Sequence, residues 1–246
     1  MSSTKLYLLD VEGTVAPLTL TTEVLFPYAW RHFRKFLSEN IDDPKVREDL
    51  ILLAEENHAE TDLEVPRRLP KVKWTGFVDG VKFQVDAFIY LLWLMDRDRK
   101  STALKSLQGK IWKAGFESGE LKGTVFPDVP LAFERWAAQA KIAIYSSGSV
   151  DAQKLFFRHS SHGDLTPLIS GYFDTRTGPK LEPASYAAIA AEMGVEPDEA
   201  LFFSDVVGEL DAAREAGLQT RLVIREGNAP VEDARGHHSI ETLPLL

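Results

Sequence analysis

Apolar residues stand in short consecutive runs at the start of the chain and again beyond residue 140. Runs of this length are typical of strands that are buried on both faces of a parallel sheet. They predict four strands, at Leu6–Leu9, Ile142–Tyr145, Leu201–Phe203 and Arg221–Ile224. Helical patterns follow the second of these strands and predict helices at Val150–Arg158, Ala184–Met193 and Glu209–Ala216. The alternation of strand and helix indicates an α/β sheet with crossover helices.

Between residues 19 and 119 the pattern changes to apolar positions spaced by three and four, which is typical of helices. Asp43 and Pro44 have the residue types of a helix N-cap and first turn. The apolar residues that follow them on one face are Val46, Leu50 and Leu53. We therefore expect a helical insert, residues 17–121, within an α/β core made of residues 1–16 and 122–246.

Two further helices are predicted in the insert. One has an apolar face made of Val81, Val85, Phe88, Leu92 and Met95. It contains the longest apolar run of the chain, Ala87–Met95. Since a membrane-spanning helix needs about 20 apolar residues, we interpret this run as a buried helix. The other helix is capped by Ser101 and ends near Gly119.

Composition narrows the classes of partner. The formal net charge is −9, which argues against a nucleic-acid backbone as ligand. The chain has no cysteine, so disulfides, thiolate catalysis and cysteine-ligated zinc are excluded, and a cytoplasmic location is expected. The first ten residues have too short an apolar core for a signal peptide. We expect no membrane partner and a monomer.

Polar clusters lie near the carboxyl ends of the predicted strands, where open parallel sheets bind ligands. They are Asp10–Thr14, Ser146–Ser149, Gly178–Lys180 and Ser204–Asp205. Each cluster alone has an ordinary explanation, as a turn, a helix cap or a solvated lysine. Glu209 fits equally well as a cap of its helix or as a support of a metal site.

Together the clusters describe a site for a phosphate monoester. Asp10 is the candidate nucleophile, and a divalent cation would neutralise the phosphate that it attacks. Mg²⁺ usually takes one or two carboxylates, which Asp10 and Asp205 would supply. Ser147 and nearby backbone amides would hold phosphate oxygens, and Lys180 would add positive charge. Glu12 would protonate the leaving oxygen and then activate water.

The motifs DVEGT, SSGS, the Lys180 region and FFSD follow one another in the order seen in the haloacid-dehalogenase superfamily, which the chain resembles. Glu12 stands where that superfamily usually has a second aspartate. This residue, with segments such as DRKSTALKSLQGKIWKAGFESGELKG and YSSGSVDAQKLFF, is similar to the enolase-phosphatases of methionine salvage. Val15 and Phe116 depart from the expected threonine and tyrosine, and neither has a proposed catalytic role.

The resemblance implies a Rossmannoid parallel sheet with an inserted α-helical cap. It implies that 2,3-diketo-5-methylthiopentyl-1-phosphate is enolised and then dephosphorylated to the acireductone through an aspartyl-phosphate. One Mg²⁺ per chain would be held by Asp10, Glu12 and Asp205, and the substrate would be bound by Ser146, Ser147 and Lys180. The aromatic residues considered for an apolar pocket around the methylthio tail are Phe26, Trp74, Phe77 and Trp112.

Three alternatives remain at this point. A phosphatase of the same superfamily with another small substrate, such as phosphoglycolate, is disfavoured by Glu12 and by the matching insert. An interaction module on an inactive phosphatase fold is disfavoured because every proposed catalytic residue is present. A dehalogenase would need neither a metal nor a lysine that binds phosphate.

Overall fold

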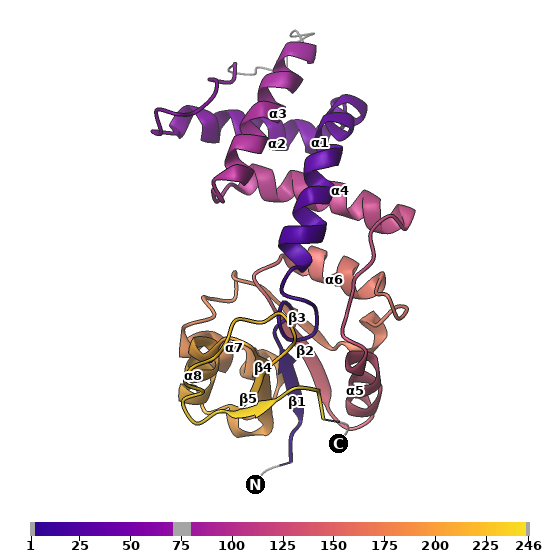
Figure 1. Cartoon of the computed structure of the whole chain (residues 1–246), viewed down its shortest axis with the longest axis vertical. Coiled ribbons are helices and arrows are strands. Elements are labelled where there is room, and N and C mark those ends of the chain that lie inside the picture. Colours follow the sequence, from indigo (N-terminus) through magenta and orange to yellow (C-terminus); the bar gives the residue numbers. More distant parts are fainter. Residues whose placement is uncertain (1–2, 71–79, 245–246) are drawn as a thin grey trace. The chain divides into compact units, whose positions relative to one another are not determined.

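The computed structural model describes residues 3–70 and 80–244, and the chain divides into two compact units (Figure 1). One unit combines Met1–Thr21 with Phe116–Leu246 and holds the sheet, and the other is Thr22–Gly115 and is helical. That the helical unit acts as a cap stays a prediction. Trp74 and Phe77, two of the residues considered for an apolar pocket, lie outside the described residues.

The sheet has the strand order β3-β2-β1-β4-β5-β6 in the described part of the chain, and every neighbouring pair is parallel. The predicted α/β fold class is confirmed. The strands are β1 (Leu6–Leu9), β2 (Lys141–Tyr145), β3 (Gly171–Phe173), β4 (Ala200–Ser204), β5 (Gln219–Val223) and β6 (His238–Ile240). β1 lies in the middle of the sheet, where Leu6 is in register with Lys141 on one side and Ala200 on the other.

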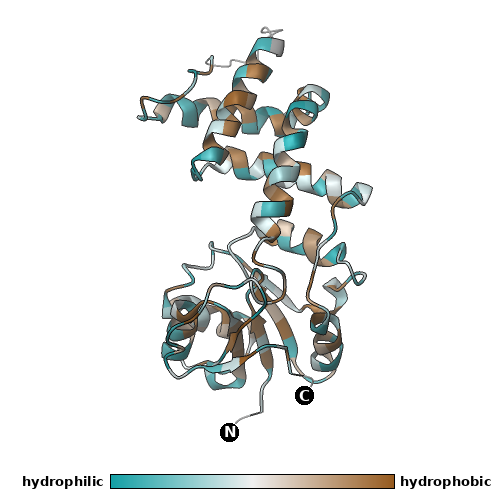
Figure 2. Ribbon diagram, viewed as in Figure 1, coloured by the Kyte–Doolittle hydropathy of each residue, from teal (hydrophilic) through white to brown (hydrophobic). Residues whose placement is uncertain are grey.

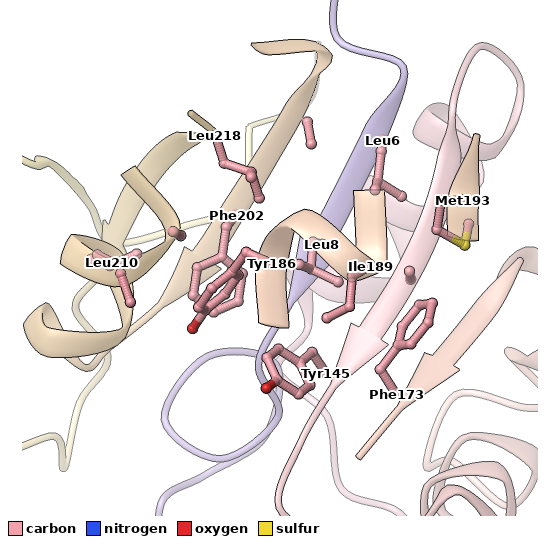
Figure 3. Packing of buried hydrophobic residues seen from close by; sticks show 14 of the residues in the cluster. Leu6, Leu8, Tyr145, Phe173, Tyr186, Ile189, Met193, Phe202, Leu210 and Leu218 are labelled. Carbon is pink, nitrogen blue, oxygen red and sulfur yellow. The ribbon is translucent and has the colours of Figure 1, made fainter. Parts of the chain in front are cut away.

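Helices cover both faces of this sheet (Figure 1). They are α5 (Asp128–Ala137), α6 (Val150–Arg158), α7 (Pro183–Met193) and α8 (Val207–Glu215), with short 3₁₀ turns at Thr166–Leu168 and Pro197–Glu199. α7 and α8 bury an apolar cluster against β1, β2 and β4 (Figure 3). On the α5 side the core is aromatic, since Trp136 stacks on Tyr7 at 4.2 Å and on Phe203 at 5.3 Å.

The helical unit contains α1 (Phe26–Asn40), α2 (Pro44–Ala59), α3 (Gly80–Asp96) and α4 (Thr102–Ser118), and a π-helical turn at Leu20–Leu25 leads into it. The predicted cap of α2 is confirmed, because the Asp43 carboxylate accepts hydrogen bonds from the amides of Lys45 (2.7 Å) and Val46 (3.2 Å). Ser101 caps α4 by accepting from the Leu104 amide at 2.9 Å. Local polar residues therefore decide where these helices begin.

The predicted buried face of α3 is wrong. Val85 is 43% exposed, whereas the buried side chains of this helix include Phe83, Ala87, Tyr90, Leu91 and Leu94. Apolar residues occupy most of α3 (Figure 2), so their spacing alone does not select a face. The face is selected by packing against α1 and α2, and by the buried Asp86 carboxylate, which pairs with Arg67 at 2.6 Å.

Of the four candidates for an apolar pocket, the two that are described lie together in the helical unit. The rings of Phe26 and Trp112 stack with centroids 6.5 Å apart, and the Trp112 indole donates to the Leu25 carbonyl at 2.9 Å. In the part of the chain that the structure describes, no helix has the length and apolar character needed to cross a membrane.

Candidate active site

Asp10 directly follows β1 at the carboxyl edge of the sheet and is 7% exposed. Its amide continues the parallel pairing by donating to the Phe203 carbonyl at 3.0 Å. The Asp10 carboxylate accepts a hydrogen bond from the Lys180 ammonium, with 2.6 Å between Oδ1 and Nζ. The predicted nucleophile is thus fixed by the central strand and ion-paired with the predicted lysine.

The turn after Asp10 brings the Asp205 carboxylate onto the backbone of Gly13. The Val11 carbonyl accepts from the amides of Thr14, Val15 and Ala16, which closes the turn tightly. Gly13 has a positive φ of 74°, and a Cβ at this position would overlap the Asp205 carboxylate. Only glycine permits this approach between the loops that follow β1 and β4.

The Glu12 carboxylate lies beside these groups and accepts a hydrogen bond from the Thr21 hydroxyl. Burial raises the pKa of Glu12, and the negative charge of Asp10 raises it further, against the opposing effect of the Thr21 hydrogen bond. A carboxyl group with a raised pKa retains a proton more readily near neutral pH. The environment of Glu12 therefore suits a group that donates a proton and later accepts one.

Lys180 is paired with two carboxylates. Its ammonium lies 2.6 Å from Asp10 and 2.7 Å from Glu209. Burial acts to lower the pKa of Lys180, but the two carboxylates outweigh it and hold that pKa above its ordinary value. Glu209 also accepts from the Ser204 hydroxyl at 3.0 Å, so its side chain turns to Lys180 and Ser204 and does not cap α8. Of the two roles that the sequence left open for Glu209, the structure excludes the cap, and support of a metal site stays a prediction.

We call the carboxylates of Asp10, Glu12, Asp205 and Glu209 the acidic cluster, and within the described residues they outnumber the one ammonium among them, that of Lys180. Burial and the nearby Asp10 carboxylate raise the pKa of Asp205 to about 6. The same two causes raise the pKa of Glu209 to about 7, although Lys180 opposes them. A bound cation would oppose both causes, because it would favour the charged form of these carboxylates.

The donor set suits a small hard cation. Across residues 3–70 and 80–244 no three acidic or histidine side chains converge in the manner of a complete metal-binding set. Mg²⁺ does not need such a set, because it usually takes one or two carboxylates and completes its shell with water and substrate oxygens. Asp10 and Asp205 interact electrostatically and provide two carboxylates. The residues present therefore fit Mg²⁺ better than a metal that requires four protein ligands.

The serines that follow β2 differ in burial and in their hydrogen-bond partners. Ser146 is buried, and its hydroxyl accepts from the Gly148 amide at 3.2 Å, whereas Ser147 is exposed. Ser149 caps α6 by accepting from the Ala152 amide at 3.3 Å, so neither Ser146 nor Ser147 serves as that cap. Among the described residues, neither of these two hydroxyls is hydrogen-bonded to the acidic cluster.

Sequence reasoning did not single out Thr21, Tyr145, Ser185 or Tyr186, which contact the site or the segment that carries Lys180. Thr21 is nine residues from Glu12, and the two tyrosines have the pattern of ordinary core residues. No periodicity or motif in the sequence indicates which groups these hydroxyls contact.

Comparison with known proteins agrees with this arrangement. The family model of haloacid dehalogenase-like hydrolases matches residues 4–217. The enolase-phosphatase E1 of Synechococcus elongatus is 52% identical over 239 residues, which cover 96% of each chain. The crystal structure of the UTR4 protein of Saccharomyces cerevisiae is 33% identical, covers 98% of each chain and superposes with a TM-score of 0.75.

A more distant solved structure shares the fold. The hydrolase YfnB of Bacillus subtilis, which is described as bound to magnesium, is 14% identical with a TM-score of 0.52 and covers 98% of this chain and 96% of its own. The match to the family model and the near-complete alignment with curated enolase-phosphatases agree with the order of motifs and with the parallel sheet. The chain therefore belongs to the enolase-phosphatase E1 family of haloacid dehalogenase-like hydrolases.

Proposed function

We propose that the chain enolises 2,3-diketo-5-methylthiopentyl-1-phosphate and then removes its phosphate to give the acireductone. The relatives named enolase-phosphatase E1 support this reaction. The observation that carries it is the Asp10 carboxylate at the end of the central strand, paired with Lys180 at 2.6 Å and next to Glu12 and Asp205. The substrate is a small phosphate ester, and we expect a cytoplasmic monomer.

Phosphate transfer follows from the positions of these groups. An Asp10 oxygen attacks phosphorus while the bond from phosphorus to the leaving oxygen breaks, and Glu12 gives its proton to that oxygen. The Lys180 ammonium compensates the negative charge of the phosphoryl group. Glu12, now ionised, then takes a proton from water, and the resulting hydroxide attacks the phosphorus of the aspartyl-phosphate. Inorganic phosphate leaves, and Asp10 is regenerated.

One Mg²⁺ per chain belongs to this proposal. Asp10 and Asp205 would hold it through their carboxylates, and Glu12 through its backbone carbonyl. When bound, the ion neutralises phosphate charge and polarises the dicarbonyl of the substrate.

We assign the remaining phosphate contacts to Ser146 and Ser147 with the backbone amides that follow β2. These residues precede the N-terminus of α6, a position that favours anions. We assign to the helical unit the role of a cap that excludes water during the reaction.

Product analysis by ³¹P and ¹H NMR tests the function. The diketone phosphate with Mg²⁺ should yield inorganic phosphate and the acireductone, and an excess of chelator should stop both. Asp10→Asn keeps the shape of the side chain and should abolish phosphate release while the protein stays folded. Release of phosphate by this variant would refute the covalent step. An active wild type that rejects the diketone but hydrolyses phosphoglycolate would favour the alternative substrate.

A further inference from the structure

Three successive backbone carbonyls in the segment 178–180 each accept a hydrogen bond from a buried hydroxyl. Tyr145 at the end of β2 donates to the first carbonyl at 2.9 Å. Ser185 on α7 donates to the second at 2.8 Å, and Tyr186 on the same helix donates to the third at 2.7 Å. The last of these carbonyls belongs to Lys180 itself, whose side chain reaches Asp10.

The two tyrosines combine a core position with a polar contact. Both are fully buried, and their rings meet edge to face with centroids 5.5 Å apart. Figure 3 shows both tyrosines in the apolar cluster that α7 buries, and both hydroxyl oxygens point toward the lower left of the view. A buried phenol needs a partner for its hydroxyl. The segment 178–180 provides that partner, so the core and the active-site segment are joined directly.

The backbone of this segment has little freedom to shift. A Cβ on Gly178 would overlap the Ser185 hydroxyl, so the segment packs tightly on the start of α7. Pro179 follows Gly178, and its ring restricts its own φ. Lysine has a long side chain with four rotatable bonds, and placing its ammonium between Asp10 and Glu209 requires a fixed Cα.

We propose that Tyr145, Ser185 and Tyr186 are positioning residues, which hold the segment 178–180 so that the Lys180 ammonium meets Asp10 and Glu209. The proposal rests on the proposed function for the role of Lys180. The three hydroxyls bond to the backbone of this segment, Tyr145 and Ser185 also share a side-chain hydrogen bond, and all three act on the reaction through the placement of the lysine.

Single-atom deletions test this inference. Tyr186→Phe and Tyr145→Phe each remove one donor and keep the ring in the core. We expect kcat for phosphate release to fall by about fivefold in each, since one hydrogen bond contributes about 1 kcal/mol. KM for the diketone phosphate should stay within about twofold, on the same conversion of free energy to affinity.

Tyr172→Phe is the matched control. Tyr172 lies on β3, and its buried hydroxyl has no hydrogen-bond partner among the described residues. The same substitution there should leave kcat within about twofold of the wild type. A loss in Tyr172→Phe equal to that in Tyr186→Phe would show only general damage to the core and would overturn the inference.

A double-mutant cycle separates positioning from general structural support. In a Lys180→Ala background, Tyr186→Phe should cause no further loss of kcat, because the group that it positions is gone. Equal losses with and without Lys180 would contradict the proposal.

A measurement without substrate keeps this inference separate from the function. Acetic anhydride with mass spectrometry reports how fast Lys180 is acylated. The wild type and Tyr172→Phe should be equally protected, and Tyr186→Phe should react about fivefold faster, as expected when one anchoring hydrogen bond is lost. Unchanged acylation in Tyr186→Phe overturns the positioning role, whereas an inactive wild type with faster acylation in the variant overturns only the proposed function.

Discussion

Glu12 has one methylene more than an aspartate at the same backbone position, and its carboxyl is held by Thr21 on one side. Burial raises its pKa, which keeps a proton available for the leaving oxygen. These two properties, reach and proton retention, are what the proposed acid role requires at the scale of one residue.

Glu12→Gln keeps the shape of this side chain and removes its proton. Phosphate release from the diketone phosphate should slow by about 10²–10⁴-fold, the usual span for lost acid–base catalysis. The loss should be smaller for p-nitrophenyl phosphate, whose leaving group needs little protonation. Initial rates on both esters measure this difference, and equal losses would argue that Glu12 only shapes the turn.

Gly13→Ala tests the contact between the two acidic loops. A methyl group at this position overlaps the Asp205 carboxylate, and the positive φ of 74° disfavours alanine. We expect Mg²⁺ affinity, measured by titrating activity with the metal, to fall by at least about tenfold. Gly109→Ala in α4 is the control, because its Cβ meets no atom within 4 Å. Unchanged Mg²⁺ affinity in Gly13→Ala would remove Asp205 from the metal site.

At the scale of elements, Arg225 after β5 connects three parts of the unit that holds the sheet: the turn after β1, the start of α5 and the segment at Leu243. The Arg225 guanidinium is 8% exposed and donates to the Thr14 carbonyl at 3.0 Å. It also forms a two-pronged pair with the Asp128 carboxylate on α5, at 3.1 and 2.9 Å. The Asp128 carboxylate accepts in turn from the Leu243 amide at 2.7 Å. One buried arginine thus links the turn after Asp10 to α5 and to the segment that contains Leu243.

Arg225→Ala should lower the free energy of unfolding by about 1–3 kcal/mol, because the partly buried Asp128 carboxylate loses its counter-charge and the Thr14 carbonyl loses its donor. Urea denaturation measures this loss. Arg235→Ala is the control, since its pair with Asp211 is largely exposed and such pairs contribute about 0–1 kcal/mol. A loss in Arg225→Ala no larger than in the control would contradict a linking role.

The elements that sequence predicted well have strong local signals. The runs LYLL and IAIY are apolar throughout, and the bounds of α6 agree with Val150–Arg158 because Ser149 and the following periodicity mark them. β3 and β6 were not predicted. Each has three residues, β3 begins with glycine, and β6 is an exposed edge strand, so their pairing depends on the neighbouring strand. The face of α3 was likewise decided by its neighbours.

Site residues divide in the same way. Asp10 and Asp205 were candidates because each follows a predicted strand, where parallel topology brings such residues together, whereas Lys180 precedes a helix and became a candidate only through the surrounding motifs. For Glu209 the sequence offered support of a metal site or capping of its helix, and its ion pair with Lys180 was not predicted. The hydroxyl of Tyr145 bonds to a carbonyl 33 residues away and that of Tyr186 to one six residues away, and no sequence pattern indicates either partner.

At the scale of the whole molecule, the acidic cluster links stability to pH and to Mg²⁺. Asp205 and Glu209 have folded-state pKa values of about 6 and about 7, above the ordinary values of 3.8 and 4.5. At these two positions the folded protein therefore binds more protons than the unfolded chain between these values. Without metal, the stabilising effect is complete below about pH 4 and is lost as the pH rises through 6 and 7.

Thermal unfolding in chelator should accordingly show Tm falling between about pH 5 and pH 8. Mg²⁺ at about 100 times its Kd should add about 2.7 kcal/mol at pH 8, or roughly 5–10 °C in Tm for a chain of this size. Asp205→Asn should reduce both effects. A Tm that rises with pH in chelator would show that these carboxylates are already compensated.

The central place of β1 has a consequence for the order in which this protein is made. The strand that precedes Asp10 leaves the ribosome before its partners on both sides, β2 and β4, which begin at residues 141 and 200. The helical unit intervenes and is complete by residue 115. β1 therefore has no strand partner until β2 has been made, and Asp10 acquires its final position only after β4 has emerged. A nascent chain arrested before β4 would leave β1 at the edge of an incomplete sheet, where its unpaired backbone is open to other chains.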